Sequence, residues 1–122
     1  MSIALTSNRS RGKQFEQLAV RYLSDQGLQL LDQNFQLAGG EIDLILRHHE
    51  YLVFCEVKYR RGAHFASILE QINPQQLARV RHSARVWLLQ KGLSEHQTAI
   101  RFDIITISGV CPYQIDWFRD AF

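Results

Sequence analysis

The sequence predicts an α/β domain in which helices cover a layer of β-strands. Two stretches, residues 10–26 and 73–91, carry apolar side chains at helical spacing. Extended apolar runs rich in Val, Ile and Phe lie between and after them. The 122 residues, 46% of them hydrophobic, suit one compact domain over residues 1–122 with no internal repeat or linker.

The first predicted helix spans residues 10–26, and Gly27 is placed to end it. Its apolar residues recur at i, i+3, i+4, i+7 and i+8, which predicts one buried stripe formed by Phe15, Leu18, Ala19, Tyr22 and Leu23. Glu16 lies at the edge of that stripe, about 100° around the helix from Phe15. We therefore expect the Glu16 carboxylate to approach whatever the helix covers.

Residues 28–35 form the first predicted strand, and the loop 38–40 leads into a hairpin. With a turn centred on His49 and Glu50, paired residue numbers in this hairpin sum to 99. Ile45 then faces Phe54, and the charged pairs are Asp43 with Glu56 and Glu41 with Lys58. Strand alternation puts Asp43, Glu56 and Lys58 on one face. The other face is apolar and carries Leu44, Leu46, Val53, Cys55 and Val57.

The second predicted helix begins near Asn73, with Pro74 in its first turn, and runs to Lys91 before Gly92. Its apolar side is Leu77, Val80, Ala84, Trp87 and Leu88. Residues 101–107 and 114–118 are two further predicted strands. Because a long helix joins residues 51–59 to residues 101–107, these two strands can pair in parallel, which gives a mixed sheet.

Asp43 and Glu56 interrupt strands that are otherwise apolar, and an unpaired buried charge costs several kcal/mol. Three explanations remain open at this point. Lys58 forms a plain ion pair with Glu41 or Glu56, or one carboxyl is protonated. Alternatively, a divalent metal is bound by Asp43 and Glu56, with Glu16 approaching from the first helix.

Other polar and aromatic residues have simpler interpretations. Neighbouring strand or turn residues point apart, so we expect His48 and His49 at an exposed hairpin tip. Asp103 is interpreted as the ion-pair partner of Arg101 and not as a third metal ligand. Trp117 is either a core residue or part of a self-association surface.

Net charge, apolar runs and cysteines indicate the partners and the compartment to expect for this protein. A net charge of +2 does not by itself indicate nucleic-acid binding, but basic residues cluster at 9–13, 58–61 and 79–85. The N-terminus lacks a signal-peptide core, and no apolar run approaches the ~18 residues of a membrane span. Two cysteines without metal spacing suit a reduced compartment. We expect a cytoplasmic protein that does not enter membranes.

Several blocks resemble the YraN-like family, which belongs to the restriction-endonuclease-like superfamily. They are GKQFE (12–16), GGEIDLI (39–45), FCEVKYR (54–60), RFDIITI (101–107) and WFRDAF (117–122). The resemblance implies a three-layer α/β fold, with a central mixed β-sheet flanked by helices as in Holliday-junction resolvases. It also implies a catalytic site of Asp43, Glu56, Lys58 and Glu16, in which Asp43, Glu56 and Glu16 bind Mg²⁺ or Mn²⁺.

The implied activity is metal-dependent cleavage of DNA, with branched or structured DNA as a candidate substrate. A module that keeps the fold and binds nucleic acid or protein without cleaving is the alternative. Symmetric cutting of both strands would require a homodimer, because one site attacks one strand. The expected nucleic-acid contacts are basic or amide side chains: Lys13, Arg60, Arg61, Gln76, Arg79 and Arg85. Gln76 departs from the lysine that is usual in the family, and an amide cannot neutralise a phosphate.

Overall fold

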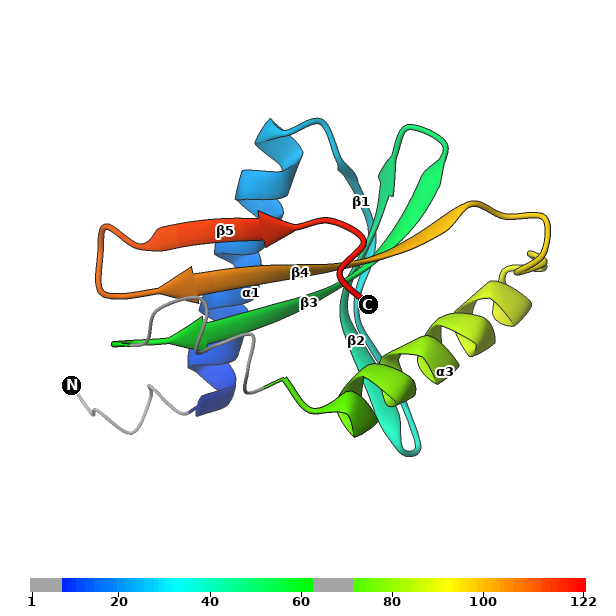
Figure 1. Ribbon diagram of the computed structural model, residues 1–122, viewed down its shortest axis with the longest axis horizontal. Coiled ribbons are helices and arrows are strands. Elements are labelled where there is room, and N and C mark those ends of the chain that lie inside the picture. The colour runs from blue at the N-terminus through cyan, green and yellow to red at the C-terminus, as the bar shows by residue number, and fades with distance from the viewer. Residues whose placement is uncertain (1–7, 63–71) are drawn as a thin grey trace.

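The structure is a computed structural model that describes residues 8–62 and 72–122 (Figure 1). Helices and strands follow in the order α1 (Asn8–Asp25), β1 (Gln29–Leu37), β2 (Gly40–His48), β3 (Tyr51–Arg60), α3 (Pro74–Gln90), β4 (Ile100–Ser108) and β5 (Gln114–Phe118).

The strands form one five-stranded mixed sheet in the order β1-β2-β3-β4-β5. β3 and β4 pair in parallel, and the other neighbours pair antiparallel. The predicted parallel pairing of these two strands is confirmed. The β1–β2 hairpin crosses the direction of β3, β4 and β5 steeply, as expected for a twisted sheet (Figure 1).

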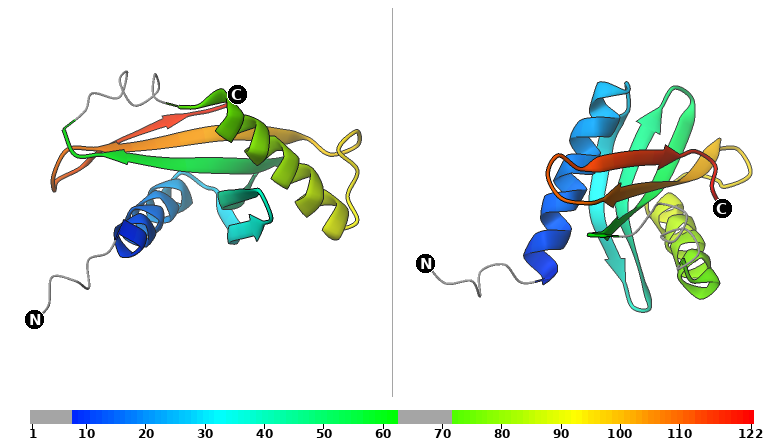
Figure 2. Two further views of the ribbon diagram at one scale, coloured as in Figure 1. Left: turned by 90° about the horizontal axis from the view of Figure 1, so that it is seen from below. Right: turned by 60° about the vertical axis from the view of Figure 1, so that its left-hand side comes forward.

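The two described helices cover opposite faces of the sheet (Figure 2). The apolar stripe of α1 packs on the face that presents Leu44, Leu46, Val53 and Cys55. The apolar side of α3 packs on the other face, against Ile42, Ile45, Leu52 and Phe54. The layered α/β prediction is therefore confirmed. Within the described residues, neither helix combines the length and apolar character needed to cross a membrane.

Local sequence sets the ends of both helices. Gly27 has a φ of 94°, a left-handed conformation that glycine adopts without strain, and it follows the last turn of α1. Asn73 caps α3, where its side chain accepts a hydrogen bond of 2.8 Å from the Gln75 N–H. Pro74 follows at a first-turn position that needs no N–H donor. These ends agree with the prediction to within two residues.

The predicted register of the β2–β3 hairpin is confirmed over its outer half. Ile45 pairs with Phe54, and His48 pairs with Tyr51. The ladder ends at the pair Leu44–Cys55. The strands separate beyond it, so Asp43 with Glu56 and Glu41 with Lys58 are not ladder pairs. The expected direct pairing of these charged residues is wrong, because the steep β1–β2 hairpin leaves β3 at this point (Figure 1).

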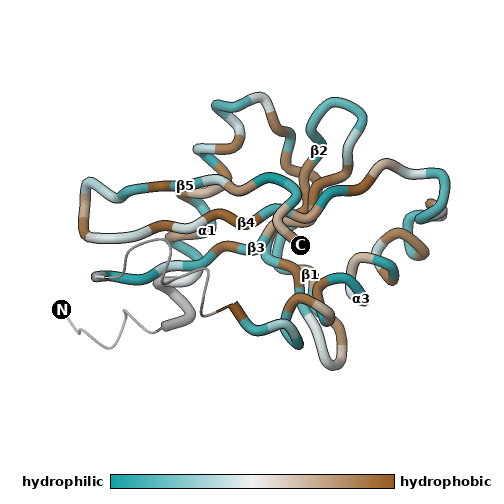
Figure 3. The backbone as a smooth tube through the Cα atoms, viewed as in Figure 1, coloured by the Kyte–Doolittle hydropathy of each residue, from teal (hydrophilic) through white to brown (hydrophobic). Residues whose placement is uncertain are grey.

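His48 is not part of an exposed tip, contrary to expectation. Its side chain is 6% exposed, and its Nδ1 accepts a hydrogen bond of 3.0 Å from Arg101 Nη2. The turn is limited to His49 and Glu50, so His48 remains a strand residue and faces inward. His49 is exposed in the hydrophilic turn (Figure 3).

Asp103 has the structural role predicted for it. Its carboxylate is fully buried and accepts two hydrogen bonds from Arg101, at 2.9 and 3.0 Å. The Trp117 indole N–H and the Asp120 backbone N–H also donate to it, each at 2.9 Å. Trp117 is partly buried and packs against the core on the α1 face. This network holds the chain after β5 against β4.

Candidate functional site

The gap between β2 and β3 is bridged by two carboxylates. The Asp43 backbone N–H donates a hydrogen bond of 3.2 Å to Glu56 Oε2. The Val57 backbone N–H donates one of 2.9 Å to Asp43 Oδ2. Because the strands have separated, side-chain oxygens here take the place of ladder carbonyls. The sequence places two acids where the fold leaves backbone donors without strand partners.

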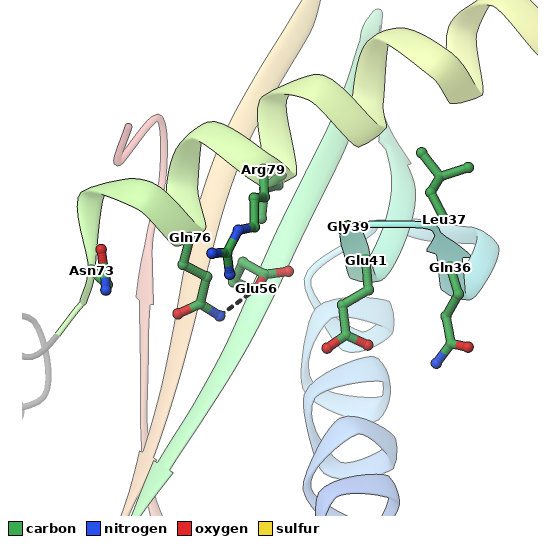
Figure 4. A pocket seen from close by; sticks show the side chains of 10 residues that line it. Gln36, Leu37, Gly39, Glu41, Glu56, Asn73, Gln76 and Arg79 are labelled. Atoms are coloured by element: carbon green, nitrogen blue, oxygen red, sulfur yellow. Dashed lines mark hydrogen bonds between the residues drawn. The ribbon is translucent and has the colours of Figure 1, made fainter.

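Glu56 reaches a cleft on the α3 side of this gap (Figure 4). The residue is 2% exposed, and its Oε1 accepts a hydrogen bond of 3.4 Å from Gln76 Nε2. The cleft has a volume of ≈ 570 Å³. Arg79 and Glu41 face Glu56 across it, and the remaining lining residues are Gln36, Leu37, Gly39, Gly40, Asn73 and Val80.

Asp43 reaches a second cleft on the α1 side, with a volume of ≈ 460 Å³. Glu16 lines this cleft together with Asp43, as the position of Glu16 on the helical stripe predicts. The other lining residues are Gly12, Lys13, Asn34, Gln36 and Glu41. Gln36 and Glu41 are paired in the β1–β2 hairpin and line both clefts. This end of the hairpin therefore stands between the two clefts.

Alternation alone predicts that Asp43 and Glu56 share one face of the sheet. The structure shows that they do not. Glu56 follows Cys55, which packs on the α1 face, so Glu56 points to the α3 side. Asp43 points to the α1 side because the alternation of β2 is interrupted next to it: Ile42 and Ile45 pack on the same face. The two acids meet from opposite sides of the gap.

Burial raises the pKa values of the three acids, and the charge of a neighbouring carboxylate adds to the rise in each. Burial, followed by the charge of Asp43, raises the pKa of Glu56 to about 8. Burial raises the pKa of Asp43, while the Val57 N–H and Lys58 oppose the rise. Burial, again with the charge of Asp43, raises the pKa of Glu16 to about 7. Each negative charge in this gap is costly, so a cation placed here would be strongly attracted.

Lys58 supplies positive charge to both central acids without touching them. Its charge lowers the pKa of Asp43 and of Glu56, against the effect of burial. Within the described residues, no ion pair joins Lys58 to Glu41 or Glu56. The simple ion-pair explanation of the Glu-x-Lys pattern is therefore wrong for this fold.

The donor set of the gap fits a small divalent cation. Mg²⁺ prefers oxygen ligands and needs only one or two protein carboxylates, with water completing its shell. Asp43 and Glu56 are two such carboxylates within one gap. In the part of the chain that the structure describes, no group of three His, Cys, Asp or Glu side chains is placed to hold a metal ion. The fit therefore depends on Asp43 and Glu56, and Glu16 lines the same cleft as Asp43.

The predicted basic contacts divide into two groups. Lys13 lines the cleft beside Asp43, and Arg79 lines the cleft beside Glu56. Arg85 is not among the residues lining either cleft: its Nε lies 3.2 Å from Glu95 Oε2. Arg60 and Arg61 are exposed at and just after the end of β3. Of the expected contacts on α3, Arg79 therefore lies at a cleft, whereas Arg85 is paired with Glu95.

Sequence reasoning missed Asn34 as a residue of the site. Asn34 lies inside β1 with a φ of 54° and lines the same cleft as Glu16 and Asp43. An available signal was its residue type, because Asn is depleted in strands but is enriched among non-glycine residues with positive φ.

Comparison with known proteins places the chain in a family. The model of "Uncharacterised protein family UPF0102" matches residues 15–107. A UPF0102 protein of Idiomarina loihiensis is 47% identical over 111 residues, which cover 91% of this chain and 95% of that protein. UPF0102 proteins of Pectobacterium carotovorum and Vibrio campbellii are both 40% identical, and the matches cover 95% and 98% of this chain. The YraN-like resemblance is confirmed at this level, and the chain belongs to the UPF0102 family.

Proposed function

We propose that the chain is a metal-dependent nuclease of the restriction-endonuclease-like superfamily, which binds DNA and hydrolyses a phosphodiester bond. The observation that carries the proposal is the acid pair in the gap between β2 and β3. Asp43 and Glu56 are held by backbone N–H groups, and their pKa values are raised. Acids in clefts whose pKa values are shifted by burial and by a specific charged neighbour are candidates for functional sites.

Each residue of the site has a definite task in this proposal. Asp43 and Glu56 would hold Mg²⁺ or Mn²⁺, with Glu16 as an outer carboxylate. When bound, the ion supplies Lewis-acid polarisation of a phosphoryl oxygen. Lys58, which is close enough to lower the pKa of both acids, would offset negative charge that develops on the attacked phosphate.

The residues that line the two clefts support binding of a phosphate backbone. Lys13 on the α1 side and Arg79 on the α3 side each add a cation to a cleft that also contains carboxylates. These cations would contact phosphates on either side of the reacting one. Gln76 donates to Glu56 and would orient that carboxylate.

One experiment tests the proposal. Labelled single-stranded, nicked duplex and four-way-junction DNA are incubated with the purified protein, with and without Mn²⁺. We expect Mn²⁺-dependent cleavage that Asp43→Asn abolishes. The matched control is Asp25→Asn, which removes the same charge from an exposed residue at the end of α1. Binding without cleavage would favour the inactive module, and no binding at ~50 mM salt would remove the nucleic-acid proposal.

A further inference from the structure

His48 is a buried titratable residue that the proposed nuclease does not use. It ends β2, is 6% exposed and lines neither cleft of the acid site. The ring centroids of His49 and Trp117 lie 4.5 and 5.7 Å from the ring centroid of His48. Burial disfavours the charged form of an imidazole, so the protonation state of this ring matters to the fold.

The hydrogen bond to Arg101 fixes that protonation state. Arg101 Nη2 lies 3.0 Å from His48 Nδ1. A guanidinium has only donors, so Nδ1 must accept this bond with its lone pair. The neutral ring then carries its proton on Nε2, and a second proton could be added only at Nδ1. Protonation of His48 and its bond to Arg101 therefore exclude each other.

The groups around His48 oppose a positive charge on its ring. The charged or titratable ones are Arg101 and Asp103 on β4, Tyr51 on β3, His49 in the turn and Arg119 after β5. Burial, followed by the charges of Arg101, His49 and Arg119, lowers the pKa of His48, and Asp103 opposes this change. Asp103 already accepts two hydrogen bonds from Arg101. A protonated His48 would therefore compete with Arg101 for the same carboxylate.

The pair of Arg101 and Asp103 also holds the residues that follow β5. Arg101 donates to the two carboxylate oxygens of Asp103 at 2.9 and 3.0 Å. The Asp120 N–H donates to the same carboxylate at 2.9 Å, and the next N–H, that of Ala121, donates to the Phe102 carbonyl at 2.7 Å. A shift of Arg101 would move the carboxylate to which the C-terminal residues are bonded.

We propose that His48 is a pH-sensitive latch for the C-terminal residues 119–122, which its neutral imidazole holds on β4 through Arg101 and Asp103 and which its protonation releases. Opening takes up one solvent proton at Nδ1 and breaks the hydrogen bond from Arg101 Nη2. The latch does not rest on the proposed nuclease, because its residues line neither cleft of the acid site.

The latch opens on the acid side. The pKa of His48 in the folded protein lies below the ordinary value of 6.5, so the unfolded chain takes up the proton first. The stabilisation by the neutral ring is fully present above pH 6.5. It is lost as pH falls through the lower pKa of the folded state. Release of the C-terminal residues is therefore expected below pH 6.5.

Two asparagine variants test the latch. In His48→Asn the amide oxygen can accept the bond from Arg101, but the side chain has no proton to gain in this pH range. The matched control is His49→Asn, which removes the neighbouring exposed imidazole. His49 has a φ of 57°, and asparagine tolerates this left-handed conformation. Each variant removes one imidazole near the turn, and only the first removes the one bonded to Arg101.

Nuclear magnetic resonance reads the latch from signals of the folded protein, which a small unfolded fraction does not move. The ¹⁵N shifts of the His48 ring give its tautomer and its pKa. The signals of the Trp117 indole N–H and the Asp120 amide report their bonds to Asp103. The ¹⁵N heteronuclear NOE of Ala121 falls when the C-terminal residues become mobile on the ps–ns timescale.

In the wild type we expect the Nε2–H tautomer of His48 at about pH 7.5. As pH falls, the Trp117 and Asp120 signals should shift with the midpoint of the His48 titration. The Ala121 NOE should decrease in the same step. His48→Asn should lack this step, and His49→Asn should keep it.

A His48 proton on Nδ1 at about pH 7.5, or a ring that stays neutral down to about pH 4.5, would overturn the latch. So would Trp117 and Asp120 signals that do not follow the ring, or an Ala121 NOE that stays constant. The same step in His48→Asn would also overturn it, because the signals would then follow another group. If His48→Asn does not fold, the wild-type titration decides: signals that follow the ring together with a falling NOE support the latch, and any other result overturns it.

Discussion

Glu56 shows at the scale of one residue why an acid in a sheet is costly. Its side chain is 2% exposed, and burial together with Asp43 raises its pKa to about 8. The folded state therefore binds the proton more tightly than the unfolded chain, where a Glu has a pKa near 4.5. The resulting stabilisation is fully present below pH 4.5 and is lost as pH rises through about 8. Above that pH the ionised pair lowers the stability of the fold.

Glu56→Gln should remove this pH dependence. Glutamine keeps the shape and most of the hydrogen-bonding capacity of the side chain but has no charge. We expect the variant to be more stable than the wild type at pH 9, by an amount on the order of a few kcal/mol. At pH 5 the difference should be much smaller. Urea unfolding at both pH values measures this difference in unfolding free energy. A variant that is less stable than the wild type at pH 9 would show that ionised Glu56 stabilises the fold.

The same substitution should remove the response to metal. A ligand that binds only the folded state at a hundredfold excess over its Kd stabilises the protein by about 2.7 kcal/mol. We expect Mn²⁺ to raise the melting temperature of the wild type and to leave Glu56→Gln unchanged. Asp25→Asn, the exposed control, should respond like the wild type. An equal response in all three proteins would place the bound metal elsewhere.

At the scale of elements, the cleft beside Glu56 depends on how closely α3 approaches β2. Gly40 begins β2 directly beneath the helix. A Cβ on Gly40 would lie 2.5 Å from Ser83 Oγ and 3.3 Å from the Arg79 carbonyl oxygen. Both contacts are shorter than ordinary packing distances, so this approach requires glycine.

Gly40→Ala should therefore destabilise the fold by about 1–3 kcal/mol, the usual cost of overpacking. Ser83→Ala should recover part of that loss in the double variant. Ser83 Oγ is the closest contact, and this buried atom makes no hydrogen bond within the described residues. Gly12→Ala is the control, because a Cβ there meets nothing within 4 Å. Chemical unfolding gives the unfolding free energy of Gly40→Ala, Ser83→Ala, the double variant and Gly12→Ala. If the effects of Gly40→Ala and Ser83→Ala simply add in the double variant, the added Cβ does not clash with Ser83.

Arg79 and Arg85, both on α3, should contribute unequally to DNA binding. Arg79 lines the cleft beside Glu56, whereas Arg85 is paired with Glu95. Loss of one phosphate contact reduces the slope of log affinity against log salt concentration by about one. We expect this reduction for Arg79→Ala and a much smaller one for Arg85→Ala. Fluorescence anisotropy over a salt series measures both slopes, and equal reductions would show that Arg85 contacts DNA as Arg79 does.

At the scale of the whole molecule, a second acid has the opposite role. Asp103 is fully buried, and all its hydrogen bonds join parts of the fold: Arg101 on β4, Trp117 on β5 and the Asp120 N–H beyond it. Arg101 continues the network to His48 on β2. The network connects three strands and the C-terminal residues without opening to either cleft.

Asp103→Asn should destabilise the fold by about 3–5 kcal/mol, because it leaves the buried Arg101 without a counter-charge. Asp116→Asn, at a less buried residue on β5, serves as the control. Thermal unfolding compares the two variants. The Mn²⁺ response of any folded Asp103→Asn should match that of the wild type, and its loss would connect Asp103 to the acid site.

The sequence by itself determined the elements, most of the hairpin register and the choice of acids. Helical stripes, the cap at Asn73 and glycine at helix ends are local signals, and they predicted both described helices to within two residues. The central helix between two apolar runs predicted the parallel pairing of β3 and β4. Asp43, Glu56 and Lys58 stood out because charges are costly in apolar strands.

Only the tertiary structure decided how these residues meet. Alternation assumes a regular ladder, but β2 leaves β3 after Leu44, and Ile42 and Ile45 pack on the same face on either side of Asp43 and Leu44. Whether His48 is exposed depends on Arg101, which is 53 residues away in sequence. Sheet twist and long-range side-chain contacts set these positions, and neither is written in the spacing of neighbouring residues. For that reason the sequence named the acids of the site, while the fold decided which cleft each of them faces.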